Sequence, residues 1–170
     1  MSESIDKTLL DSAFDGTEDT QREKYLTFHL GEETYGIEIK HVREIIGIQK
    51  ITEVPEMPDF IRGVINLRGQ VIPVMDVRAR FNMKDRDYDD RTCVVVVEVK
   101  ESTIGLVVDT VSEVADIPDS EVSPPPRVSK AASNRYIKGM GKTGEQVKIL
   151  LDADKLLFDD ELALVAENVA

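Results

Sequence analysis

The residues most similar to a catalytic motif are Gly141-Lys142-Thr143, which match the end of a phosphate-binding P-loop. A P-loop carries its first glycine five residues before the second, and Tyr136 occupies that position here. The run that follows, Gln146–Leu151, is typical of a strand, whereas a phosphate cradle needs the N-terminus of a helix. The sequence therefore predicts a hairpin turn here and no nucleotide binding.

Three aspartates could form a calcium loop. Asp85, Asp87 and Asp89 have the one-three-five spacing of such a loop. However, Asp90 stands where the loop needs glycine, and Val96 stands where it needs a bidentate glutamate. We interpret residues 84–91 as a solvated linker.

The two histidines, His29 and His41, have no cysteine or histidine at metal-ligand spacing and no paired nucleophile. Tryptophan and glycine-rich cofactor fingerprints are also absent from the sequence. The sequence therefore predicts a protein that is not an enzyme, holds no cofactor or metal, and works by binding.

Charge narrows the choice of partner. The 170 residues include 33 acidic and 21 basic side chains, which give a net charge of −12. Nucleic acid and anionic membranes need a field of Lys and Arg, so the sequence excludes both as direct partners. No stretch approaches the ~18 apolar residues of a membrane span, and Cys93 has no second cysteine to pair with. We expect a cytoplasmic protein without membrane insertion.

The elements that would present a binding surface are mostly strands. β-branched runs separated by Gly, Pro, Asn and Asp predict a hairpin over residues 25–39 and a mainly β protein. Residues 40–46 have the apolar spacing of a short amphipathic helix. The run Cys93-Val94-Val95-Val96-Val97 has no polar face, which predicts a strand covered on both sides. A flexible acidic tail is expected at 1–22 and a closing helix at about 154–166.

An internal repeat organises the chain. Five residues of the first half recur in the second half at a constant offset of 69: Thr34, Gly36, Val42, Glu44 and Ile45 fall on Thr103, Gly105, Val111, Glu113 and Val114. Phe60-Ile61-Arg62-Gly63 then falls on Tyr136-Ile137-Lys138-Gly139 at an offset of 76. A unit of ~60–70 residues buries little core by itself, so the two copies should share one.

Where one copy of the repeat has an exposed charged or apolar side chain that the other copy lacks, that residue is a candidate for binding. In the hairpin at 66–69, Gly69 permits a tight turn and leaves Arg68 projecting beside Leu67. A cationic and apolar pair of this kind is enriched in binding hot spots, although a solvated turn arginine is the common alternative.

Several strings of the sequence resemble the CheW family of bacterial chemotaxis coupling proteins. They are Glu33-Thr34-Tyr35-Gly36-Ile37-Glu38-Ile39, Val42-Arg43-Glu44-Ile45, Gly63-Val64-Ile65-Asn66-Leu67-Arg68-Gly69 and Lys148-Ile149-Leu150-Leu151-Asp152. The resemblance covers about residues 24–158. It implies two SH3-like five-stranded β-barrels that are related by pseudo-symmetry and share a core. We expect a CheW-like domain over 23–170, with barrels at about 24–84 and 92–152.

The resemblance also implies a non-enzymatic adaptor, recruited to membrane receptor arrays. It would join the cytoplasmic tips of methyl-accepting chemotaxis receptors to the regulatory domain of the histidine kinase CheA. The residues implied at the receptor-binding groove are Val42, Glu44, Ile45, Arg68, Val94 and Val114. The kinase-binding face would lie near Ile46 and Gly63. The alternatives are a CheW-like module of a CheV-type or other chemosensory pathway, and an unrelated SH3-like peptide-binding module.

Overall fold

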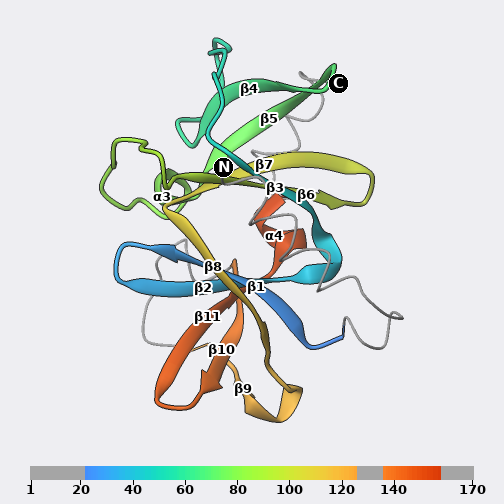
Figure 1. The fold of residues 1–170 in the computed structure, drawn as a ribbon, viewed down its shortest axis with the longest axis vertical. Helices are drawn as coiled ribbons and strands as arrows, with labels where there is room; N and C mark the ends of the chain where they lie inside the picture. The colour runs from blue at the N-terminus through green and yellow to red at the C-terminus, as the bar shows by residue number, and fades with distance from the viewer. Residues whose placement is uncertain (1–21, 126–135, 158–170) are drawn as a thin grey trace.

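The computed structural model describes residues 22–125 and 136–157, which form a mainly β structure with short helices (Figure 1). The strands are β1 (Lys24–Leu30), β2 (Glu33–Glu38), β3 (Val42–Gly47), β4 (Ile61–Leu67), β5 (Gln70–Asp76), β6 (Cys93–Val99), β7 (Ser102–Val108), β8 (Thr110–Asp116), β9 (Val122–Ser123), β10 (Ile137–Thr143) and β11 (Gln146–Leu151). The helical turns are η1 (Ile39–His41), α3 (Val77–Arg80), η2 (Asp119–Glu121) and α4 (Ala153–Leu157). The predicted tail up to residue 21 and the predicted closing helix beyond Leu157 lie outside the described residues.

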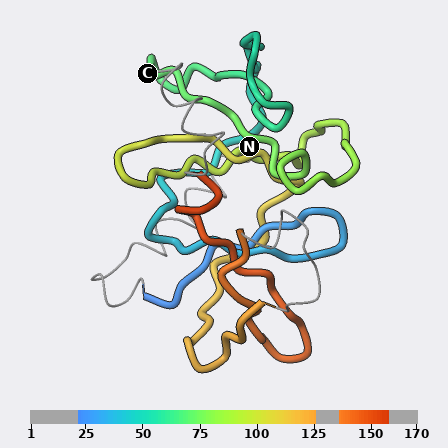
Figure 2. The backbone as a smooth tube through the Cα atoms, turned by 180° about the vertical axis from the view of Figure 1, so that it is seen from behind, coloured from blue at the N-terminus to red at the C-terminus, as the bar shows by residue number. Residues whose placement is uncertain are grey.

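The strands form two sheets, and each sheet contains one hairpin from the other half of the chain. The five-stranded sheet has the order β3-β6-β7-β5-β4, and the six-stranded sheet has the order β8-β1-β2-β11-β10-β9. The β1–β2 hairpin thus lies among strands of the second half, and the β6–β7 hairpin lies among strands of the first half (Figures 1 and 2). Neither sheet follows the contiguous boundaries predicted from the sequence, 24–84 and 92–152, because strand pairing in this fold crosses between the two copies of the repeat.

The register of the sheets reproduces the repeat. β5 pairs with β7 in parallel through Val74 and Gly105, and β11 pairs with β2 in parallel through Leu150 and Gly36. The offsets of 76 and 69 superimpose these two pairs on each other. A Cβ on Gly105 would lie 2.7 Å from Val94 Cγ1, so glycine is needed where the hairpin packs most closely. The mainly β class with two related units is confirmed. One sheet has the predicted five strands, and the other has six because the short strand β9 pairs with β10.

The short helix predicted over residues 40–46 is wrong. The structure has one 3-10 turn at η1, and β3 then pairs antiparallel with β6. The ladder shifts register between Val42 and Glu44, which is a β-bulge. Because a bulge inserts one residue, the apolar side chains Val42 and Ile45 are spaced by three, as they would be in a helix.

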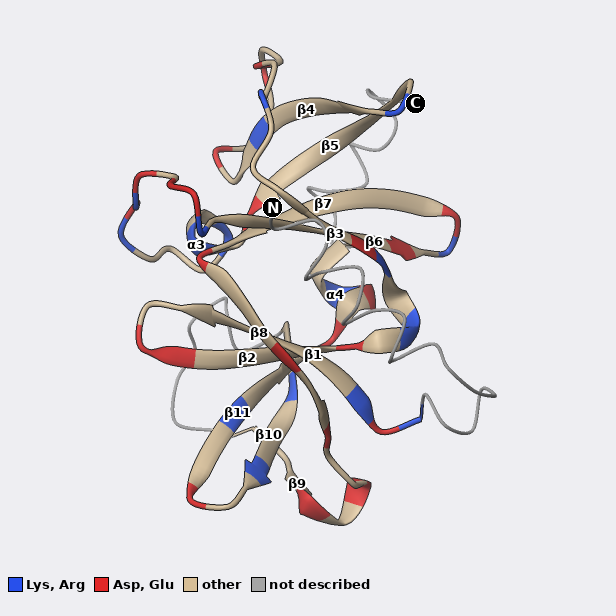
Figure 3. Cartoon of the chain, viewed as in Figure 1, with Lys and Arg blue, Asp and Glu red and all other residues tan. Residues whose placement is uncertain are grey.

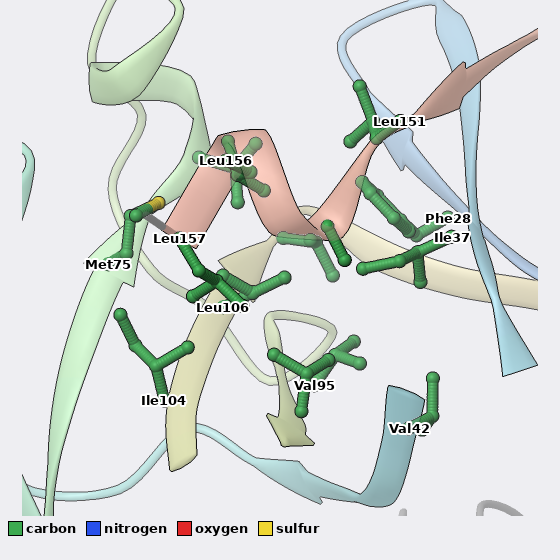
Figure 4. Packing of buried hydrophobic residues seen from close by; sticks show 14 of the residues in the cluster. Phe28, Ile37, Val42, Met75, Val95, Ile104, Leu106, Leu151, Leu156 and Leu157 are labelled. Carbon is green, nitrogen blue, oxygen red and sulfur yellow. The ribbon is translucent and has the colours of Figure 1, made fainter. Parts of the chain in front are cut away.

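The largest apolar core lies between the two sheets. Leu156 and Leu157 of α4 pack there with Phe28 from the six-stranded sheet and Leu106 from the five-stranded sheet (Figure 4). The predicted double covering of Cys93–Val97 is confirmed. Alternate residues of this run face the core between the sheets and a second core formed by the five-stranded sheet.

Gly63 is the residue whose substitution should damage the fold most directly. Its φ is +145°, and an added Cβ would lie 2.1 Å from the backbone oxygen of Thr52, which pairs with Val64. We expect Gly63→Ala to destabilise the protein by roughly 3 kcal/mol or more, since both the backbone angle and the contact oppose it. Thermal unfolding measures this loss. The control is Gly144→Ala, where φ is +64° and no atom lies within 4 Å. Equal melting of both variants would contradict the steric explanation.

Candidate functional site

Arg68 forms an ion pair with Glu44 at the surface of the five-stranded sheet. The turn between β4 and β5 places Arg68 and Gly69 at φ values of 51° and 89°, and the Gly69 amide donates a hydrogen bond of 2.7 Å to Asn66 Oδ1. This rigid turn directs Arg68 Nη2 to both carboxylate oxygens of Glu44, at 2.9 and 2.7 Å. The structure therefore brings together the two charged residues that the family resemblance implied for one groove.

The position of the pair explains what it can do. Glu44 lies on β3, at one edge of the five-stranded sheet, and Arg68 lies in the turn after β4, at the other edge, so the ion pair shows that these two parts of the sheet lie close together. The Arg68 side chain is 72% exposed and that of Glu44 is 26% exposed. Exposed pairs contribute ~0–1 kcal/mol to stability, so this pair is better suited to recognition than to holding the fold.

Most of the apolar residues predicted for the receptor groove are buried. Val42, Ile45 and Val94 are at most 4% exposed. Val114 is half-buried on β8, where it pairs with Leu26 in the six-stranded sheet. The structure thus places these apolar side chains inside the protein or partly covered, and their part in a receptor groove stays a prediction.

The two residues predicted near the kinase-binding face are also buried. Ile46 packs in the core of the five-stranded sheet, and Gly63 lies against Thr52. Ile46 and Gly63 can therefore support the shape of a nearby binding surface, but their own atoms are not exposed on it.

The structure adds Val71 to the candidate surface. Val71 is 56% exposed and lies opposite Asn66 in the β4–β5 ladder, next to the turn that carries Arg68. The alternation of β5, in which Ile72 and Val74 are buried, is the signal that could have identified it. We define the hairpin-tip surface as Glu44, Asn66, Leu67, Arg68 and Val71.

The other motifs in the sequence take structural roles. The predicted hairpin is present, but Gly141, Lys142 and Thr143 lie in β10 and the turn itself falls just after them, where Gly144 has a φ of 64°. Among the described residues, no group of three or more His, Cys, Asp or Glu side chains is placed to hold a metal. Thr34 Oγ1 lies 3.2 Å from His29 Nδ1. Burial of the other histidine, His41, lowers its pKa.

Charged side chains lie mainly in turns and at strand ends, whereas the strands themselves are largely uncharged (Figure 3). Within the described ranges, no helix is both long enough and apolar enough to cross a bilayer. The described part of the chain defines a class of protein. It is a β scaffold of two sheets with exchanged hairpins, and the exposed Arg68–Glu44 ion pair gives it a polar surface at one hairpin tip.

Comparison with known proteins identifies the family. The CheW-like domain matches residues 24–161. Chemotaxis protein CheW of Klebsiella aerogenes is 40% identical over 152 residues, which cover 89% of this chain and 91% of that protein. The corresponding protein of Bacillus subtilis is 30% identical over 135 residues, covering 79% and 86%. The scaffolding protein TtCheW of Thermoanaerobacter tengcongensis has a TM-score of 0.75 at 35% identity, covering 82% of this chain and 94% of that one. The chain belongs to the CheW family of chemotaxis scaffold proteins.

Proposed function

We propose that this protein is a non-enzymatic adaptor that couples methyl-accepting chemotaxis receptors to the regulatory domain of the histidine kinase CheA. Membership of the CheW family supports the role in chemotaxis. The observation that carries a binding function is the Arg68–Glu44 pair, since it is exposed, rigidly presented and of little value to stability. The adaptor works in the cytoplasm and is recruited to receptor arrays at the membrane.

The receptor contact is the hairpin-tip surface. Arg68 and Glu44 offer both signs of charge, and the exposed Val71 offers an apolar contact beside the turn. Val42 and Ile45 of β3 and Val94 of β6 hold the strands next to this face in place, since Val42 and Ile45 pack in the core between the sheets and Val94 packs in the second core. Val114 shapes the adjoining part of the six-stranded sheet.

The kinase contact is a separate outer face of the five-stranded sheet. Ile46 and Gly63 maintain its shape from inside, because Gly63 allows residues 51–52 to cross β4 closely. A CheV-type pathway would use the same fold, and the choice between the two depends on which partners bind.

The test is co-sedimentation of the purified protein with receptor-bearing membranes, with and without CheA. We expect the adaptor to sediment with receptors and to increase the amount of CheA in the pellet. Membranes from cells without receptors are the control. An adaptor that binds CheA and leaves it in the supernatant would overturn the coupling role.

A further inference from the structure

Asp109 occupies the point where the chain crosses from β7 of the five-stranded sheet to β8 of the six-stranded sheet. Its side chain is only 7% exposed. The Gly31 amide, in the β1–β2 turn, donates to Asp109 Oδ2 at 2.8 Å. Arg78 of α3 donates from Nε to Oδ1 at 2.7 Å and from Nη2 to Oδ2 at 2.6 Å. One carboxylate thus joins a turn of the six-stranded sheet to the helix that follows β5 in the five-stranded sheet.

The linker at 84–91 is exposed throughout, as the sequence predicted, and two of its side chains also contact this arrangement. Arg86 Nη1 lies 2.9 Å from Asp109 Oδ2, and the Tyr88 hydroxyl donates to Asp76 Oδ2 at 2.7 Å. Burial raises the pKa of Asp109, but the hydrogen bonds from Arg78, Gly31 and Arg86 outweigh this and lower the pKa to about 2. The carboxylate is therefore ionised at neutral pH.

Arg80, also in α3, contacts aromatic rings from both halves of the chain. Its guanidinium lies 4.2 Å from the ring centre of Phe60 and 4.4 Å from that of Tyr136, which are equivalent residues of the repeat. At the offset of 76 that relates Phe60 to Tyr136, the residue equivalent to Arg80 is Leu156, which is fully buried in the core. One half of the repeat therefore uses a buried cation where the other uses a leucine. Burying a charge carries a desolvation penalty, so this arginine is weak evidence for added stability.

We propose that Asp109, Arg78 and Arg86 form a junction clamp that fixes the orientation of the two sheets, and that this clamp controls coupling between partners without forming either binding surface. The control of coupling rests on the proposed adaptor function, whereas the fixed orientation does not. The clamp acts because the Gly31 turn moves with the six-stranded sheet, while α3 and the linker move with the five-stranded sheet. Replacing the shared carboxylate by an amide removes the charge that pairs with both arginines and leaves one acceptor oxygen for the three donors.

The first test uses the full chain without partners. Residual dipolar couplings of backbone amides should fit one common orientation of both sheets in the wild type. Asp109→Asn should require two separate fits and should speed hydrogen exchange of the Gly31 amide at least tenfold. Should Asp109→Asn fail to fold, Arg86→Gln removes only the linker contact and should show a smaller change of the same kind. The matched control is Asp85→Asn, which removes an exposed linker carboxylate paired with Arg62.

Unchanged couplings and exchange in both clamp variants would overturn the clamp. The second test measures binding of Asp109→Asn to a receptor tip fragment and to CheA separately, and then kinase stimulation with all three components. We expect each separate affinity to stay within twofold and stimulation to fall at least fivefold. Loosened sheets with normal stimulation would overturn the control of coupling. If the wild type itself fails to stimulate, the proposed function falls, and the orientation result stands by itself.

Discussion

Residues 24–84 expressed alone should show no cooperative unfolding transition, although they contain one complete copy of the repeat. In the intact chain, β1 and β2 pair with β8 and β11, whereas β3 and β5 pair with β6 and β7. The fragment keeps only the β1–β2 and β4–β5 hairpins, and isolated hairpins are marginal in water. The core between the sheets would be exposed, so we expect an aggregated or molten product.

The measurement is circular dichroism during heating, together with size-exclusion chromatography. Co-expression of residues 24–84 with residues 85–170 is the control, because the two pieces can then exchange hairpins as they do in the intact chain. We expect the co-expressed pair to elute as one complex and to melt cooperatively. A soluble 24–84 fragment that melts cooperatively by itself would show that each half is an independent domain.

Arg68→Glu should weaken binding to a receptor tip fragment by more than tenfold while the protein stays folded. Loss of a central arginine from an interface costs ~2 kcal/mol or more, and reversing its charge adds repulsion. The exposed pair with Glu44 is also lost, which costs at most about 1 kcal/mol of stability. The melting temperature should therefore fall by no more than about 4 °C. Calorimetric titration with the receptor fragment measures the affinity.

Lys100→Glu is a closely matched control for this substitution. Lys100 has a φ of 50° in the β6–β7 turn, is 68% exposed and pairs with Asp154, so it resembles Arg68 in conformation, exposure and partner type. We expect it to bind the receptor fragment normally. The double variant Arg68→Glu with Glu44→Arg should restore the ion pair without restoring binding. Normal receptor binding by Arg68→Glu would remove Arg68 from the site, and equal loss of CheA binding would mean that the two surfaces are not separate.

The candidate site could be predicted only in part. Arg68 was identified because a glycine turn and an adjacent leucine are local features, and the structure confirms that Arg68 is exposed. Ile46 and Gly63 are buried, which depends on strands distant in sequence. The helix predicted at 40–46 failed for a related reason, since a β-bulge and a helix both space apolar residues by three.

The sequence by itself determined the elements and their equivalence. Strand alternation, the turn at Gly69, the two-sided run Cys93–Val97 and the repeat are all encoded by neighbouring residues or by constant offsets. The tertiary structure alone decided which copy of each hairpin joins which sheet, because either copy presents the same alternation to a partner strand. The tertiary structure also decided which carboxylates the side chains of the linker contact. The linker is exposed as predicted, but its contacts from Arg86 to Asp109 and from Tyr88 to Asp76 depend on which residues the fold brings close in space, and neighbouring residues do not encode that.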